Sequence, residues 1–440
     1  MVVPAGTEIC DRTSGKTEKR EVESVCGTNK LGFVQIPETL APFRSRNYRL
    51  FYSGHAISLV GSWMTQTAIG WLVYALTQST VMSGVAMFLS QVSHFFVTPF
   101  AGVMIDRVNR FKMLLAVQFG ALAAALGLWA FEVFDGKHVA VLLALCFARG
   151  FVGSIEIPTR QSTIVKLIDD KNALPQAISL NSMMFNLTRI VSPAIAGEIY
   201  AMFGAACCFA IDSALMIPTI LLLAAMRFDG RPVAPADGGS ANESPIGALV
   251  EGVRYMLGVP VLRTVIFSIG TLSMCALSYT VLLPMFADKI YAGTPELYGR
   301  MLTVTGAGAI IAALLIAVLK RARLLPRFLV TGNLLVGCSL VVIATEPPLA
   351  VFFAALFTAG LGSVLVFASS NTLVQLNVPE RFRGRIVSLY TMANTGMFPF
   401  GTLLLGWLNE RFGLIPCLSF SAAVSFAIGI HYFCVRKIFR

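Results

Sequence analysis

Ionisable side chains inside apolar stretches are the residues of this sequence best placed to do chemistry. Arg149, Gly153, Glu156 and Arg160 follow one another at spacings of four, three and four within the apolar residues 138–165. On a helix these positions share one face. An arginine at the centre of a membrane helix costs about 2.5 kcal/mol or more if it faces lipid. The stripe therefore indicates a proton or substrate path, with an internal ion pair as the alternative.

A second polar stripe lies in the next apolar stretch, residues 175–200. At spacings of four, three, four and four it contains Ser182, Asn186, Arg189, Pro193 and Gly197. We expect the two stripes to line one cavity. Its candidate proton-coupling groups are Arg149, Glu156, Arg160, Arg189 and Asp212. Either Asp212 or Glu198 could neutralise Arg189, and the sequence does not decide between them.

The composition places these stripes in a membrane protein. Of the 440 residues, 56% are hydrophobic and 13% are charged, and the mean hydropathy is +0.74. Soluble domains carry roughly 25% charged residues. The net charge of +11 comes from basic residues in short loops and forms no continuous patch, which argues against a nucleic-acid partner. The nine cysteines show no metal-ligand spacing, so no metal site is expected.

About twelve apolar segments can cross a hydrocarbon layer about 30 Å thick. They are 48–77, 80–105, 113–131, 138–165, 175–200, 205–227, 259–287, 297–319, 327–345, 348–375, 384–408 and 413–436. A stretch rich in proline and glycine interrupts them after the sixth. We therefore predict an all-α integral membrane fold of twelve helices in two pseudo-symmetric six-helix bundles. The predicted parts are a disordered cytoplasmic tail (1–43), an N-terminal bundle (44–228), a cytoplasmic linker (229–257) and a C-terminal bundle (258–440).

An internal repeat supports the two-bundle arrangement. At a constant shift of 209 positions, Gly153 matches Gly362, Thr163 matches Thr372 and Gly204 matches Gly413, without a gap. Such a parallel duplication is typical of transporters whose halves face each other across a cavity at the membrane midplane.

Basic residues alternate between loops. Loops on one side carry most of the lysines and arginines, such as Arg110, Lys112, Arg323 and Arg327, whereas the loops on the other side carry only Lys137, Lys289, Arg300 and Arg411. Basic loops stay cytoplasmic. We expect a multi-pass protein of the inner (plasma) membrane, a monomer, with both termini in the cytoplasm.

Uncharged polar and aromatic residues are the candidates for substrate contact. They are Gln66, Gln91, Asn186, Tyr279, Asn371, Tyr390 and Asn394. The second half has no ionisable group at midplane depth, so we expect coupling in the first half and neutral contacts in the second. The expected ligand is aromatic or polyhydroxylated.

Three short motifs resemble those of the major facilitator superfamily. Residues 102–112 resemble its loop signature between helices two and three, Arg149-x-x-x-Gly153 resembles its proton-linked motif, and Ser192–Gly197 resembles its antiporter motif with two glycines replaced. Longer stretches, such as Gly61–Gln66 and Leu180–Pro193, are similar to the transmembrane-secretion-effector branch. That branch includes enterobactin-type siderophore exporters and macrolide efflux proteins.

The resemblance implies a secondary transporter that uses the proton gradient and no cofactor. It also implies a conformational lock at Gly102, Asp106, Arg107 and Arg110, in which Asp106 binds near the segment that carries Arg383 and Arg385. The expected function is proton-coupled export of a small amphipathic, siderophore-like molecule. Multidrug or macrolide efflux is the main alternative, and import or lipid transport is a further one. No catalytic motif is present, so an enzyme is not expected.

Overall fold

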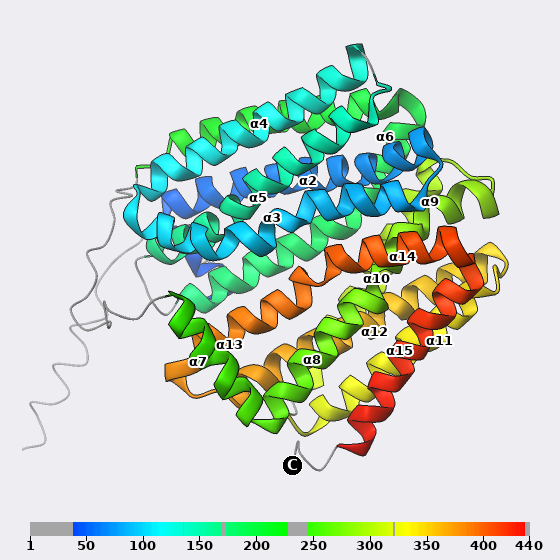
Figure 1. The fold of residues 1–440 in the computed structure, drawn as a ribbon. Helices are drawn as coiled ribbons and strands as arrows, with labels where there is room; N and C mark the ends of the chain where they lie inside the picture. The colour runs from blue at the N-terminus through cyan, green and yellow to red at the C-terminus, as the bar shows by residue number, and fades with distance from the viewer. Residues whose placement is uncertain (1–37, 135, 169–172, 228–244, 320–321, 436–440) are drawn as a thin grey trace, which may run out of the picture. The chain divides into compact units, whose positions relative to one another are not determined.

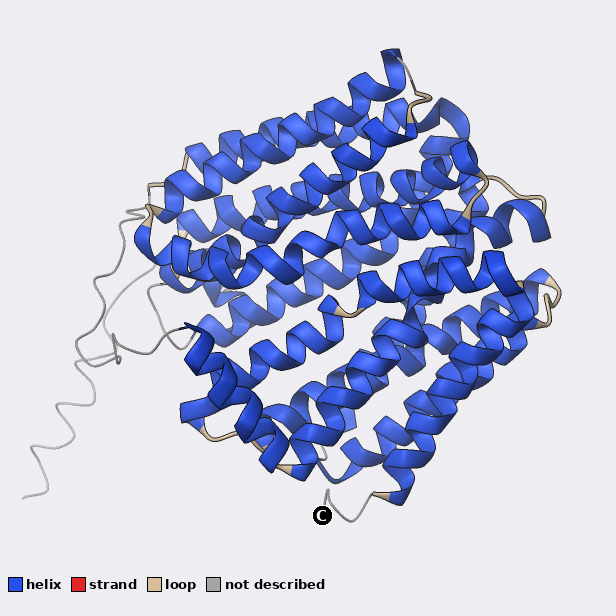
Figure 2. Cartoon of the chain, viewed as in Figure 1, coloured by secondary structure: helices blue, strands red, loops and turns tan. Residues whose placement is uncertain are grey.

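The computed structural model describes residues 38–134, 136–168, 173–227, 245–319 and 322–435, without the side chains of 98–107 and of a few other positions. These residues form helices and no strand (Figure 2). The long helices are α2 (Arg46–Thr77), α3 (Thr80–Arg107), α4 (Arg110–Phe134), α5 (Val139–Leu167), α6 (Leu174–Ala224), α10 (Pro295–Leu319), α11 (Leu325–Ala344), α12 (Leu349–Leu376) and α15 (Leu414–Cys434). Within the described part of the chain, nine segments are long and apolar enough to cross a membrane.

Shorter elements complete the chain. The α-helices are α7 (Pro245–Gly258), α8 (Pro260–Cys275), α9 (Leu283–Met285), α13 (Glu380–Thr391) and α14 (Phe398–Phe412). Short helices of 3₁₀ or π type are η1 (Glu38–Arg44), η3 (Leu277–Leu282), η4 (Phe286–Ile290), η5 (Ala322–Leu324) and η6 (Met392–Gly396). Most of the predicted tail (1–37) and the first part of the predicted linker (228–244) lie outside the described residues. The amphipathic end of that linker is α7.

Two of the predicted helices are broken. The segment predicted at 259–287 consists of α8, η3, α9 and η4, and the segment predicted at 384–408 passes from α13 through the π turn η6 into α14. Proline lacks the N–H that an α-helix needs. Pro284 lies in α9 and Pro399 in the first turn of α14, close to the two breaks. Non-α turns inside helices are frequent at functional sites.

The predicted repeat has a structural counterpart at its glycines. Gly204 has φ 80° and ψ 176°, a non-helical conformation inside α6, and Gly413 has φ 86° and ψ 173° between α14 and α15. A residue without a Cβ adopts a positive φ without strain. Cys208 and Cys417 then each donate a thiol hydrogen bond to the carbonyl twelve residues earlier. Each half thus makes the same turn at the position that the repeat predicts.

The helices pack mainly within each half of the chain. In the first half α2 contacts α6, α3 contacts α5, and α4 contacts α5 and α6; in the second, α12 contacts α10 and α11, and α11 contacts α15. The buried apolar side chains form one cluster between residues 68 and 209 and another, larger cluster mostly between 256 and 432. The main contacts between the halves are those of α3 with α14, which lie side by side in Figure 1, and of α6 with α10.

Candidate functional site: a polar cavity and its ion pairs

A cavity of about 380 Å³ lies where the two halves meet. Its wall is formed by α2, α3 and α6 from the first half and by α8, η3, α10, α12, η6 and α14 from the second. Predicted residues in this wall are Gln66, Gln91, Arg189, Tyr279 and Asn394. The lining also includes Trp63, Met87, Pro193, Ser273, Tyr298, Thr305, Ser363, Phe367, Thr395 and Phe398. Arg189 is the single charged side chain among the described residues that line the cavity.

The other predicted substrate contacts lie outside this wall. The Asn186 side chain donates to the Ser182 carbonyl one turn earlier (2.8 Å), and the Asn371 side chain accepts from Gln375 (3.2 Å). Tyr390 is buried, and its hydroxyl donates to the Phe367 carbonyl at 2.9 Å. These side chains are occupied by contacts within their own half.

Arg149 forms a buried ion pair with Asp212. Its Nη1 lies 3.0 Å from Oδ2 of Asp212, whose side chain is fully buried. The same oxygen accepts a hydrogen bond from the Thr65 hydroxyl at 2.7 Å. Gly61 makes room for this carboxylate, because a Cβ there would lie 2.3 Å from Oδ1. The pair therefore links α5 to α6 and, through Thr65, to α2.

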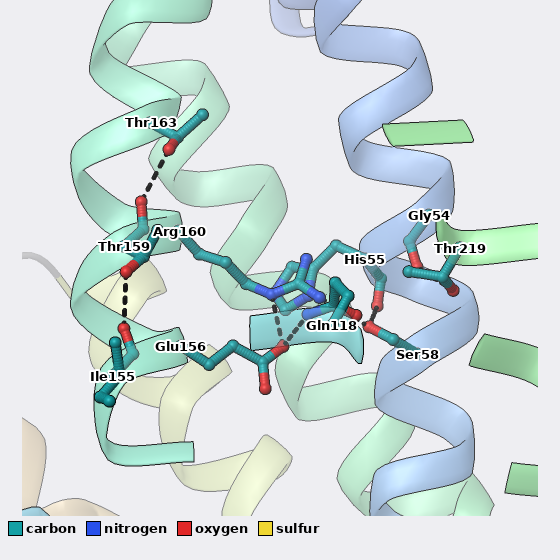
Figure 3. A network of polar contacts seen from close by, with 10 residues as sticks. All are labelled: Gly54, His55, Ser58, Gln118, Ile155, Glu156, Thr159, Arg160, Thr163 and Thr219. Carbon is teal, nitrogen blue, oxygen red and sulfur yellow. Dashed lines mark hydrogen bonds and ion pairs between the residues drawn. The ribbon is translucent and has the colours of Figure 1, made fainter. Parts of the chain in front are cut away.

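A second buried network surrounds Arg160 (Figure 3). Its Nε donates to Oε1 of Glu156 at 2.7 Å, and its Nη2 donates to the Ser58 hydroxyl of α2 at 3.1 Å. The Gln118 amide of α4 donates to the same Glu156 oxygen at 2.9 Å. The network neutralises both charges and joins three helices. Neither Glu156 nor Arg160 lines the cavity.

Arg189 has neither of the acidic partners that the sequence suggested. Asp212 pairs with Arg149, and Glu198 lies 3.3 Å from Nη2 of Arg300 on α10. Glu296 also pairs with Arg300. Among the described residues no ion pair or hydrogen bond to the Arg189 guanidinium is found. The charged residues of the stripe predicted on α5 thus belong to two ion-pair networks, whereas Arg189 on α6 lines the cavity.

The predicted lock is described only in its backbone. Gly102 and Asp106 lie in the last turns of α3, and Arg107 ends that helix, but their side chains are outside the description. Arg110 begins α4, whose first turn is capped by the side-chain oxygen of Asn109, which accepts from the Phe111 and Lys112 amides. On α13, Arg385 pairs with Glu251 of α7. Arg385, one of the two arginines on the segment predicted to bind Asp106, therefore has a carboxylate partner on α7.

Close contacts between the halves are the feature that the sequence did not predict. A Cβ on Gly84 of α3 would lie 2.5 Å from the Thr402 carbonyl of α14, and one on Gly406 would lie 2.6 Å from that of Thr80. Near the same end, Oε1 of Glu410 accepts from the Ser79 hydroxyl at 2.5 Å and from the Val81 amide at 3.0 Å.

The pair α6 and α10 is packed in the same way. A Cβ on Gly197 would lie 2.8 Å from the Pro295 carbonyl, and one on Gly299 would lie 2.4 Å from the Pro193 carbonyl. Small residues allow such close backbone approach between membrane helices. Both helix pairs thus bring the backbones of the two halves into direct contact, and α3 and α14 meet at the end that holds Thr80 and Glu410.

Comparison with solved structures shows the fold. A crystal structure of a mutant of the peptide transporter POT superposes with a TM-score of 0.71 at 14% identity, covering 96% of this chain and 98% of that one. This likeness concerns the arrangement of helices.

Several curated transporters are similar in sequence over most of their length. The staphyloferrin A transporter of Staphylococcus aureus is 25% identical over 89% of this chain and 96% of its own. The multidrug efflux pump Tap of Mycolicibacterium fortuitum is 25% identical over 80% of this chain and 87% of its own. The enterobactin exporter EntS of Shigella boydii is 26% identical over 86% of this chain and 88% of its own.

The family profile described as transmembrane secretion effector matches residues 37–438. The match covers every described helix from α2 to α15 and both walls of the cavity. The predicted family is thereby confirmed, and with it a transporter rather than an enzyme. This chain is a multi-pass membrane transporter that belongs to the transmembrane secretion effector family of the major facilitator superfamily.

Proposed function

We propose that this chain is a proton-coupled exporter of a small amphipathic molecule of the siderophore class. The observation that carries the proposal is the cavity of about 380 Å³ between the halves, lined by amides, hydroxyls and aromatic rings. Sites for small molecules have volumes of about 300 to 1,000 Å³ and a few placed polar groups. The similarity to the staphyloferrin A transporter and to EntS supports the siderophore class.

The proposed architecture is twelve membrane crossings in two bundles of six. Gly204 divides α6 into two crossings, and the broken segments 260–290 and 380–412 count as one crossing each. The two apolar clusters and the matching turns at Gly204 and Gly413 support this division. We retain the predicted parts 44–228 and 258–440 as the bundles, joined by the linker 229–257, in a monomer of the inner membrane.

Transport against a gradient requires an energy source, and we propose the proton gradient without a cofactor. The sequence contains no nucleotide-binding motif. Buried ionisable residues in membrane helices frequently belong to proton relays. The networks of Arg149 with Asp212 and of Arg160 with Glu156 supply such groups. They would couple to the cavity through α2, since Ser58 and Thr65 contact the two networks and the same helix lines the cavity.

The exporter proposal is tested in everted membrane vesicles that contain the full chain. A proton gradient should drive uptake of a labelled iron-free siderophore into these vesicles, and a protonophore should reduce that uptake to the level of vesicles without the chain. Gradient-driven uptake of ethidium without siderophore uptake would favour multidrug efflux, which the similarity to Tap supports. Siderophore accumulation only in right-side-out vesicles would indicate an importer.

The proposed orientation places both termini in the cytoplasm. In a background without native cysteines, Thr77→Cys and Gln78→Cys should react in intact cells with a membrane-impermeant maleimide, because the turn after α2 would lie outside. Arg323→Cys, in the exposed turn before α11, should react only after the cells are permeabilised. The reverse labelling pattern would contradict the topology.

A further inference from the structure

We propose that Arg189 is the anion-binding residue of the cavity and that the transported molecule is therefore an anion with carboxylate or catecholate oxygens. The inference rests on the proposed transport function and names the substrate class of its site. Arg189 is the single charged side chain among the described residues of the lining, and that lining includes no acidic residue. The cavity wall thus carries one positive charge and no compensating negative charge.

The acidic residues near the cavity are engaged by arginines other than Arg189. Asp212 and Glu156 are each engaged by another arginine, and Glu198 is engaged by Arg300. Among the described residues, no hydrogen bond or ion pair to the Arg189 side chain is found. A cation inside a membrane helix is costly unless it has a partner or faces a water-filled cavity. A bound anion would supply the missing partner.

The surroundings of Arg189 suit an aromatic or hydroxylated anion. The guanidinium presents a fork of donors that matches the two oxygens of a carboxylate or a deprotonated catechol. One turn before it on α6, Phe185 packs edge to face on Trp63 of α2, with ring centroids 5.6 Å apart. One turn after it, Pro193 also lines the cavity with Trp63. An aromatic group beside the arginine would find an apolar ring surface there.

The test measures binding to the purified full chain in nanodiscs by isothermal titration calorimetry. The probes are citrate for the carboxylate class, 2,3-dihydroxybenzoate for the catecholate class, and ethidium as an aromatic cation. We expect the unmodified chain to bind one of the two anions and Arg189→Gln to weaken that binding by at least about tenfold. Arg189→Lys should keep part of the affinity, because it retains the charge and loses the fork. Arg263→Gln, which removes an exposed arginine of α8 outside the lining, should bind as the unmodified chain does.

Several results would overturn the inference. One is equal anion affinity of the unmodified chain and Arg189→Gln. The others are tighter binding of ethidium than of both anions, and no binding of either anion at millimolar concentration. Melting temperatures establish that each variant is folded. If Arg189→Gln does not fold, the anion affinity of Arg189→Lys is compared with that of the unmodified chain instead. Anion binding through Arg189 without proton-driven uptake in vesicles would reject the exporter proposal and leave this inference standing. Proton-driven uptake of the siderophore together with equal anion affinities of the unmodified chain and Arg189→Gln would reject this inference and leave the exporter proposal standing.

Discussion

Arg149→Gln is expected to reduce proton-driven transport by at least about tenfold and to lower the thermal stability of the protein. The variant removes the guanidinium that lies 3.0 Å from a fully buried carboxylate, that of Asp212. Removing one partner of a buried ion pair costs about 3 to 5 kcal/mol, because the other charge is left uncompensated. Thr65 alone would then contact the carboxylate. Uptake in everted vesicles and the melting temperature of the purified chain measure the two effects.

The double variant Arg149→Gln with Asp212→Asn separates the two roles that this ion pair could have. Removing both charges should restore most of the melting temperature, because no buried charge remains unpaired. If the pair carries protons, transport stays lost in the double variant. Recovery of transport together with stability would instead show an ion pair that only holds α5 to α6.

An exposed pair provides the control for this experiment. Arg300 contacts Glu198 with relative exposures of 58% and 46%, so solvent screens their attraction. Pairs of this kind contribute about 0 to 1 kcal/mol. Arg300→Gln should therefore change the melting temperature much less than Arg149→Gln does.

The sequence predicts the polar face of α5 because that face depends on spacing along one helix. Arg149, Glu156 and Arg160 share it through helical periodicity alone, and the cost of a charge in lipid requires that it face protein or water. Their partners depend instead on how neighbouring helices are rotated. Asp212 is 63 positions after Arg149, and no local pattern distinguishes it from Glu198 as a counter-ion for either arginine. The unpaired state of Arg189 follows only when all these pairings are known.

The sequence predicts only part of the cavity wall, because the wall too depends on how neighbouring helices are rotated. Gln66, Gln91, Tyr279 and Asn394 line it, and polarity inside an apolar helix was the signal that marked them. Tyr390 carries the same signal, yet its hydroxyl bonds to a carbonyl within the second half. The π turn η6, which holds Asn394 and Thr395, depends on backbone geometry that hydropathy does not encode.

Gly84→Val is expected to reduce transport by at least about tenfold, because it prevents the close packing of α3 and α14 at one end of the protein. The glycine lies against the backbone of α14, and a Cβ there would be 2.5 Å from the Thr402 carbonyl oxygen and 3.0 Å from its carbon. Backbone atoms cannot rotate away as a side chain can, so α3 and α14 must separate. Overpacking of this kind costs about 1 to 3 kcal/mol. That range is enough to shift a two-state equilibrium about fivefold to more than a hundredfold.

The separation can be measured between spin labels at the ends of the two helices. Gln78, in the turn that leads into α3, and Phe412, at the end of α14, are both exposed and lie close in sequence to Thr80 and Glu410. In the Gly84→Val background the distance between labels at these positions should increase, and uptake in everted vesicles should fall by at least about tenfold.

The matched control is Gly258→Val at the end of α7, where an added Cβ has no atom within 4 Å. It should leave both the label distance and transport unchanged. Because the closed end would lie outside in the proposed orientation, Gly84→Val should favour an outward-open state. Labelling of Trp63→Cys, a position in the cavity wall, by an impermeant reagent from outside should then increase. An unchanged distance with normal transport would show that α3 and α14 need not pack at Gly84 during the transport cycle.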